Sequence, residues 1–153
     1  MSTTSTTVSQ NTLLCQIESN ILLLPDVSVA EIIDYQPVES DDDMPTWFLG
    51  LLDWRELEIP LVSLEALKDN TFFSHSSTLK IIIVNSTSHR DDFAYWGFVA
   101  AEAPKMRRLV KDQLTAGELS DSEFVRAVAR MDDDTVLIPD LAAIETQIAE
   151  LIC

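Results

Sequence analysis

Residues Leu49–Val62 read LGLLDWRELEIPLV, and this stretch decides the fold. It belongs to two apolar runs, residues 47–52 and 57–64, which flank the polar segment Asp53–Glu56. Two apolar runs joined by a short polar segment are typical of a β-hairpin. The sequence therefore predicts two antiparallel strands whose tip is formed by residues 53–56.

Short segments with β character lie on both sides of this hairpin. Leu79–Val84 is rich in β-branched residues, which indicates a strand that is buried on both faces. Lys105–Leu114 fits either a strand or a helix. We expect three further hairpins, formed by Leu13–Glu18 with Ile21–Leu24, Leu79–Val84 with Phe93–Ala101, and Phe124–Met131 with Thr135–Ile138.

Two segments carry helix signals. Ser28–Glu31 has the S-x-x-E form of a capping box, which predicts one or two helical turns that end near Asp34. In Asp140–Ile152 the apolar residues recur at spacings of three and four, which predicts an amphipathic helix. Asp140 stands where the N-cap of that helix is expected.

The order of these elements indicates a mostly β, barrel-like domain. Short strands follow one another without strand–helix–strand alternation, so a doubly wound parallel sheet is not expected. The 153 residues are the usual size of one domain and allow a real core. Met1–Gln10 is rich in Ser and Thr and has neither a basic residue nor an apolar core, so we expect a disordered tail and no signal peptide.

The charge of the chain is strongly negative and unevenly placed. The formal net charge of −16 opposes binding to nucleic acid or to anionic lipid. The first 54 residues contain no Lys or Arg, so Arg55 is the first cation of the chain. A cation in such acidic surroundings is expected to have a carboxylate partner that fixes its direction.

Cysteine content and hydropathy bear on the compartment. The two cysteines, Cys15 and Cys153, suggest no disulfide framework, so a reducing, cytoplasmic location is expected. No apolar run approaches the ~18 residues that span a bilayer. Cys15 lies in an apolar strand and is interpreted as a small buried hydrophobe.

Motifs for catalysis, cofactors or metals are absent from the sequence. The three glycines cannot form a phosphate-binding loop, and His75 and His89 have no partner at metal-ligand spacing. The acidic runs 41–43 and 132–134 lack the alternating ligands and closing Glu of a calcium loop, so a solvated loop and a hairpin turn are expected there.

Two further features admit two interpretations each. Lys105, Arg107, Arg108 and Lys111 form the only basic cluster, either a contact for an acidic partner or, as we favour, the cations of an exposed edge strand or helix face. Trp54 is either an exposed residue of an interface, where Trp and Arg are enriched, or is folded back on the barrel.

Several motifs, in order, resemble the CheW-like domain family. Trp47–Arg55 followed by Ile59–Leu64 is similar to the family's apolar-Gly pair, its Asn-Leu-Arg-Gly and its Ile-Pro-Val-Val-Asp-Leu. The likeness spans roughly residues 11–150. Three other segments match the family pattern, namely Leu24-Pro25 with Val29–Ile33, Trp96–Val99, and Val136–Leu141.

The resemblance implies a fold and a function. The fold would be two small SH3-like five-stranded β-barrels packed together, with short helices that include a C-terminal one, within a single domain over 11–153. One sub-barrel would cover about 11–67, to which C-terminal elements could be added, and the other about 79–138. The protein would be a non-catalytic cytoplasmic adaptor, without cofactor, that couples a methyl-accepting chemoreceptor to a CheA-type histidine kinase.

The resemblance also implies which residues bind partners. Glu31 and Arg55 correspond to the acid and the Arg on the family's receptor-facing surface, and Glu31 is a candidate carboxylate for Arg55. Asp53 and Glu56 replace the family's Asn and second Gly, which indicates a divergent branch. Trp54 at the Leu position, together with Ile138–Leu141 near the end, looks most like ChpC-type proteins of type IV pilus (twitching motility) systems. The implied partner-binding residues are Glu31, Leu49, Gly50, Asp53, Trp54, Arg55 and Glu56.

Three alternative functions stay open. The first is a CheW-fold module for a different signalling partner. A β-barrel enzyme would need a deep cavity where Glu31, Asp53, Arg55 and a His converge. An acidic mimic of nucleic acid would need one continuous carboxylate face.

Overall fold

The computed structural model describes residues 9–17, 21–38, 43–64, 79–86, 94–110, 114–116, 124–131 and 134–152. These residues form short strands, a 3₁₀ turn and a C-terminal helix. In chain order the elements are β1 (Ser9–Gln16), β2 (Ile21–Pro25), η1 (Asp26–Ser28), β3 (Val29–Asp34), β4 (Phe48–Trp54), β5 (Leu57–Val62), β6 (Lys80–Asn85), β7 (Tyr95–Ala100), β8 (Lys105–Val110), β9 (Leu114–Ala116), β10 (Val125–Met131), β11 (Asp134–Pro139) and α2 (Leu141–Ile152).

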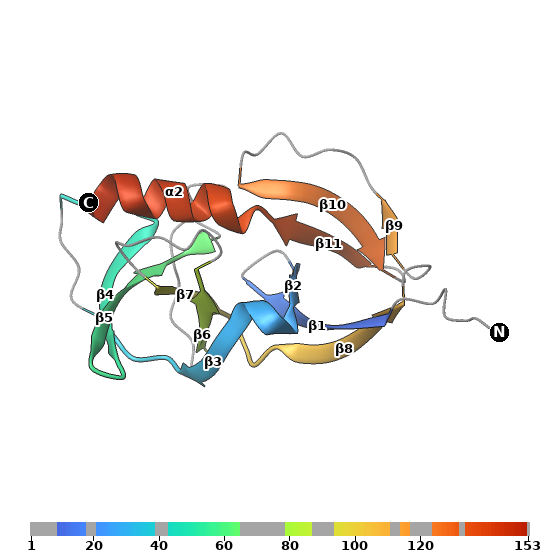
Figure 1. Ribbon diagram of the computed structural model, residues 1–153, viewed down its shortest axis with the longest axis horizontal. Coiled ribbons are helices and arrows are strands. Elements are labelled where there is room, and N and C mark those ends of the chain that lie inside the picture. Colours follow the sequence, from blue (N-terminus) through green and yellow to red (C-terminus); the bar gives the residue numbers. More distant parts are fainter. Residues whose placement is uncertain are drawn as a thin grey trace.

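The strands form two sheets that lie side by side along the long axis of the molecule (Figure 1). One has six strands in the order β8-β1-β2-β11-β10-β9, and the other has five in the order β3-β6-β7-β5-β4. The chain begins in the six-stranded sheet, builds the whole five-stranded sheet with β3–β7, and then returns to the first. Parallel pairing of β2 with β11 places a strand from the first part of the chain beside a strand from its last part.

This topology divides the chain at other places than the sub-barrels expected at 11–67 and 79–138. The five-stranded sheet takes residues 29–100, and β1 and β2 share the other sheet with β8–β11. The cause is that β1 pairs with β8 and β2 with β11, partners that are distant along the chain. Short-range sequence patterns contain no information about such pairs.

The hairpins expected from the sequence are all present. β1 pairs with β2, β4 with β5, β6 with β7, and β10 with β11, each antiparallel. The ambiguous segment 105–114 is a strand, β8, over most of its length. β1 begins at Ser9, so Ser9 and Gln10 belong to a strand and not to the tail expected for residues 1–10. Residues 1–8 lie outside the described part of the chain.

The prediction of a short helix over residues 28–34 is wrong. The 3₁₀ turn η1 ends at Ser28, and Val29–Asp34 is the edge strand β3, paired with β6. The β-branched residues Ile32 and Ile33 favour a strand. Pairing with the buried strand residues Ile81–Val84 stabilises this segment more than a capping box followed by a single helical turn would. A register shift between Val29 and Glu31 marks a β-bulge, which re-aims the side chains that follow.

The five-stranded sheet has buried residues on both faces. Ile81, Ile83 and Val99 pack with Leu52 and Trp54 in one cluster. On the other face lies a larger cluster that includes residues of both sheets and of α2, among them Leu13, Leu24, Ile82, Trp96, Phe98, Ile144 and Ile148. The strand 80–85 is therefore buried on both faces, as its composition predicts.

Helix α2 lies over the five-stranded sheet (Figure 1). Asp140 caps it, because its Oδ1 accepts a hydrogen bond from the amide of Ala143 at 3.1 Å, which confirms the expected N-cap. The carboxylate of Glu145 is fully buried and accepts hydrogen bonds from Trp96 Nε1 at 3.2 Å and Ser86 Oγ at 3.0 Å. This contact fixes the helix to the sheet.

Candidate functional site

The tip of the β4–β5 hairpin is a two-residue turn formed by Arg55 and Glu56. Trp54 pairs with Leu57, and the two turn residues have φ angles of 49° and 65°. Positive φ at both central positions is the geometry of a type I′ turn, for which Gly and Asn are preferred. Glu56, which replaces the family's Gly, therefore occupies a left-handed conformation that costs about 1 kcal/mol or more.

Glu31 meets this tip from the opposite edge of the sheet. Its Oε1 lies 2.7 Å from Arg55 Nη2, and its Oε2 accepts a longer hydrogen bond, 3.4 Å, from Trp54 Nε1. β3 and β4 are the two edge strands of the five-stranded sheet. The sheet therefore curls far enough for one carboxylate to join its edges, and Glu31 is the carboxylate partner of Arg55.

Trp54 forms the base on which Arg55 lies. The guanidinium carbon of Arg55 is 4.7 Å from the centroid of the Trp54 ring, at cation–π distance. The indole itself is 7% exposed and packs against Tyr95 with ring centroids 4.9 Å apart. Of the two interpretations of Trp54, the structure shows the residue folded back on the sheet.

The resulting arrangement is a rigid support with an exposed charged end. The Arg55 side chain is 67% exposed and that of Glu31 is 34% exposed. An exposed ion pair adds only about 0–1 kcal/mol to stability. The carboxylate, the indole ring and the positive-φ turn together orient one guanidinium toward solvent. We call Glu31, Trp54 and Arg55 the Arg55 cluster.

The other predicted site residues do not contact this cluster in the same way. Leu49 is half-buried and packs against the core around Leu52. Gly50 is buried, has a φ of 145° and lies at a register shift of β4, a bulge at which a side chain would be strained. Asp53 and Glu56 are exposed. Tyr95, which supports Trp54, was not predicted, and nothing in its short strand marked it.

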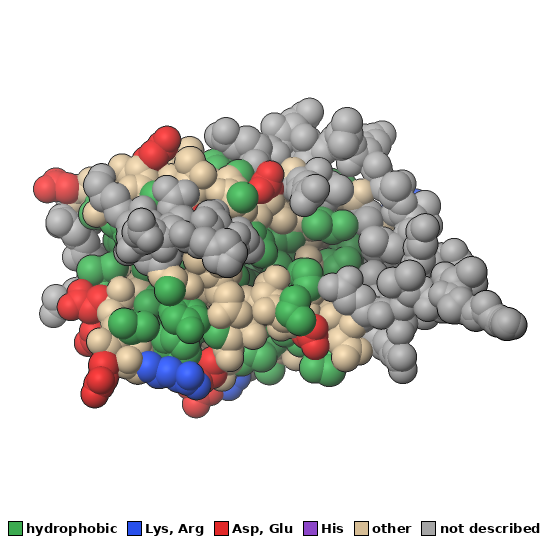
Figure 2. Space-filling model, in the orientation of Figure 1, with side chains coloured by type: hydrophobic (Ala, Val, Ile, Leu, Met, Phe, Trp, Pro, Cys, Tyr) green, Lys and Arg blue, Asp and Glu red, His purple; other side chains and the backbone are tan. Residues whose placement is uncertain are grey.

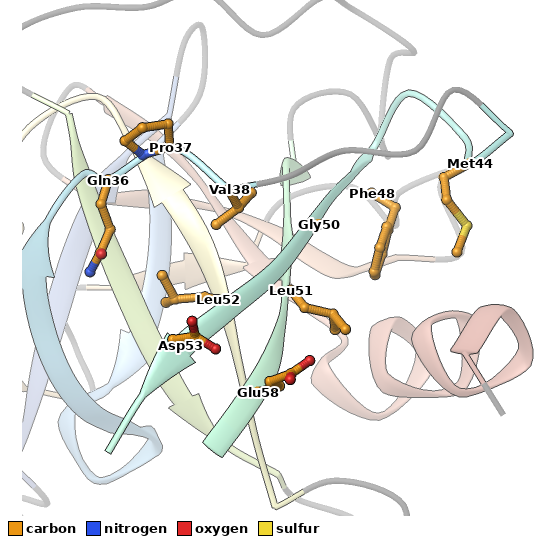
Figure 3. A pocket seen from close by; sticks show the side chains of 10 residues that line it. All are labelled: Gln36, Pro37, Val38, Met44, Phe48, Gly50, Leu51, Leu52, Asp53 and Glu58. Atoms are coloured by element: carbon orange, nitrogen blue, oxygen red, sulfur yellow. The ribbon is translucent and has the colours of Figure 1, made fainter. Parts of the chain in front are cut away.

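A pocket of about 530 Å³ lies beside the hairpin (Figure 3). It brings together Gly50 and Asp53 from the predicted set, and no residue of the Arg55 cluster lines it. The remaining lining residues were not predicted. They come from the segment after β3, from the loop before β4 and from both hairpin strands, and only the folded sheet brings these parts together. They are Gln36, Pro37, Val38, Met44, Phe48, Leu51, Leu52 and Glu58.

The described residues contain no group of three His, Cys, Asp or Glu side chains arranged to hold a metal ion. His75 and His89 lie outside them, as do residues 41, 42, 132 and 133 of the acidic runs. The convergence that an enzyme would need is not found among the described residues, since Glu31 and Arg55 belong to the cluster while Asp53 lines the pocket.

Three further features bear on the remaining predictions. Cys15 is buried, and desolvation raises the pKa of its thiol to about 12, as expected of a buried hydrophobe.

Lys105 and Arg107 lie on β8, an edge strand, which agrees with the interpretation that we favoured for the basic cluster. No helix in the described part of the chain is long and apolar enough to cross a membrane.

Figure 2 shows how charge is distributed on one face of the molecule. The described acidic side chains on this face are spread around it and do not gather in one patch. The described residues on the side shown do not form the continuous carboxylate face that a nucleic-acid mimic would need.

Comparison with known proteins agrees with the fold. The family model described as "CheW-like domain" matches residues 11–148. A similar solved structure is the scaffolding protein TtCheW from Thermoanaerobacter tengcongensis, with a TM-score of 0.73 and 17% sequence identity over 88% of this chain and 86% of that one. At this identity the structural likeness concerns the fold. No curated protein sequence matches.

Proposed function

Because this chain belongs to the CheW-like domain family, we propose that it is a non-catalytic adaptor that couples a methyl-accepting chemoreceptor to a CheA-type histidine kinase. Such an adaptor needs two surfaces that bind different partners at once. Each interface can be small and weak, because an array of many copies gains strength through multivalency.

The observation that carries this proposal is the contact of the exposed Arg55 with both the Glu31 carboxylate and the Trp54 ring. Holding a long side chain in one conformation before binding lowers the entropic cost of association. Glu31 and the ring of Trp54 hold Arg55 in this way, yet its side chain stays 67% exposed. We propose the Arg55 cluster as the centre of the receptor-binding surface, with Asp53 and Glu56 beside it and Leu49 and Gly50 further along β4.

A narrower assignment follows from departures in the central motif. Trp54, together with Ile138–Leu141 near the end, resembles the corresponding segments of ChpC-type proteins. We propose that the pathway controls type IV pili and twitching motility as part of a two-component system. The adaptor would then act in the cytoplasm and be recruited to membrane receptor arrays.

The direct test is binding of Arg55→Asp to a receptor signalling fragment and to the kinase from the same host. We expect loss of receptor binding with an unchanged circular dichroism spectrum. Arg130→Asp makes the same charge reversal at another exposed Arg, on β10, and should bind normally. Normal receptor binding by Arg55→Asp would show that this surface is assigned wrongly.

One observation favours a second function, a CheW-fold module for a different signalling partner. Glu56 adds a carboxylate, in a strained turn, where the family has Gly. Crosslinking and co-purification from the native host decide between the two. Recovery of a CheA-type kinase supports the adaptor, and recovery of an unrelated partner without a kinase supports the second function.

A further inference from the structure

The pocket beside the hairpin follows the free edge of strand β4. In the described residues β4 pairs with β5 alone, so it ends the five-stranded sheet. Leu51, exposed, and Leu52, buried, point to opposite faces of β4, yet both line the pocket. Gln36–Val38, which follow the other edge strand, form its far side. The pocket therefore lies where the two edges of the curled sheet separate beyond the Arg55 cluster.

The backbone of β4 offers hydrogen-bonding groups along this edge. In a hairpin with a two-residue turn, the pair that flanks the turn, here Trp54 and Leu57, exchanges ladder hydrogen bonds. Pairs then alternate, so the amide and carbonyl groups of Leu51 and Asp53 point away from β5. No backbone hydrogen bond from these two residues to another described segment is found. Such an edge is a template for one more strand.

The pocket has an apolar end and an acidic end. Figure 3 shows Met44 and Phe48 toward one end, and Asp53 and Glu58 toward the other. Asp53 and Glu58 are directly opposite each other in the β4–β5 register, and both are exposed. Like charges in this position are destabilising. Neither carboxylate forms an ion pair with another described residue. The neighbouring cation, Arg55, is paired with Glu31.

We propose that this pocket binds an extended segment of a partner protein, which adds to β4 as a further strand. The segment would place a Lys or Arg side chain between Asp53 and Glu58 and an apolar side chain against Leu51, Met44 and Phe48. An extended segment is favoured over a helix because only an extended backbone can pair with the outward-facing amide and carbonyl groups of Leu51 and Asp53. A basic segment suits the two carboxylates and the net charge of −16.

This interaction goes beyond the proposed adaptor function. It uses the edge of β4, whereas receptor binding was assigned to the guanidinium of Arg55. The two surfaces adjoin on one hairpin, so a partner on β4 would lie next to the receptor. Asp53 and Gly50 belong to both surfaces, but Arg55 is assigned to receptor binding alone and Leu51 to the pocket alone, so substitutions at these two residues separate the interactions.

The test uses the full-length protein and a seven-residue Thr-rich peptide with one Val and one Lys two residues apart, so that both lie on the same face of a strand, as Leu51 and Asp53 do on β4. Amide NMR and hydrogen exchange report its binding at concentrations up to about 1 mM. We expect shifts and slower exchange at the amides of Leu51 and Asp53. A peptide with Glu in place of Lys should not bind. N-methylation of alternate peptide amides should abolish binding if the contact is a backbone ladder.

Variants of the protein distinguish the pocket from general surface attraction. Leu51→Lys should prevent binding, whereas Leu57→Lys, an equally exposed position on β5 outside the pocket, should not (exposure 44% and 46%). Asp53→Asn with Glu58→Gln should weaken binding about threefold to tenfold. Arg55→Asp should leave peptide binding intact. Absence of binding by the Val–Lys peptide, or equal loss in both Leu variants, would overturn the proposal.

Discussion

The carboxylate of Glu31 on β3 lies 2.7 Å from the guanidinium of Arg55 at the β4–β5 turn, and it joins the two edges of one sheet. This contact closes the sheet at one end and orients the exposed Arg55. Below it, the edges separate and leave the pocket along β4. The ion pair lies between the two surfaces to which we assign binding, and neither of its residues lines the pocket.

Replacing Glu31 by Gln tests whether orientation of Arg55 matters for binding. The neutral amide cannot form the ion pair, so Arg55 gains freedom and receptor affinity should fall several-fold. The melting temperature should change little, since an exposed pair contributes about 0–1 kcal/mol. Asp34→Asn is the matched control, because Asp34 is on the same strand and is paired with Lys80. If both variants bind equally well, the orienting role of Glu31 is refuted.

Replacing Glu56 by Gly should stabilise the protein. Gly adopts a φ of 65° without strain, and we expect a gain of about 1 kcal/mol in the free energy of unfolding measured with urea. Glu58→Gly, two residues later in β5, should instead cost about 0.5–1 kcal/mol, because Gly weakens a strand. A loss of stability in Glu56→Gly would mean that the turn does not have the left-handed geometry.

Replacing Glu145 by Ala should destabilise the protein. The change leaves the buried Trp96 Nε1 and Ser86 Oγ without their carboxylate acceptor, at a cost of about 1–3 kcal/mol. Glu150→Ala changes an exposed position on the same helix and should be nearly neutral. Equal unfolding midpoints for the two variants in urea would show that the buried carboxylate does not fix α2 to the sheet.

Cys15 should make the protein less stable at high pH. Burial raises the pKa of its thiol from 9.0 to about 12, so the folded state holds the proton more tightly than the unfolded chain does. The contribution to stability is complete below pH 9 and is lost as the pH rises toward about 12. Cys15→Ala should show a shallower decline of the unfolding free energy over this range, and a parallel decline would contradict the assignment. In the native protein the Cys15 thiol should also resist alkylation at pH 8.

Local features of the chain were predictable from sequence patterns. The four hairpins and the capped C-terminal helix depend on neighbouring residues, whose alternation, turns and spacing are visible in the chain. The error at residues 28–34 shows the limit of such patterns. A capping box predicts a helix only when the residues after it are more stable in a helix than in a strand paired with a neighbour. Here β6 provides a buried neighbouring strand for Ile32 and Ile33.

By itself, the sequence determined the strand-rich architecture, the hairpin at residues 53–56 and the presence of a solitary cation in acidic surroundings. Only the tertiary structure decided which strands share a sheet, that Glu31 meets Arg55 from the opposite edge, and that Trp54 lies beneath Arg55 and not in solvent. The physical reason is distance along the chain. These contacts exist because two buried clusters curl a sheet whose edge strands are far apart in sequence, and no local pattern in LGLLDWRELEIPLV encodes that curvature.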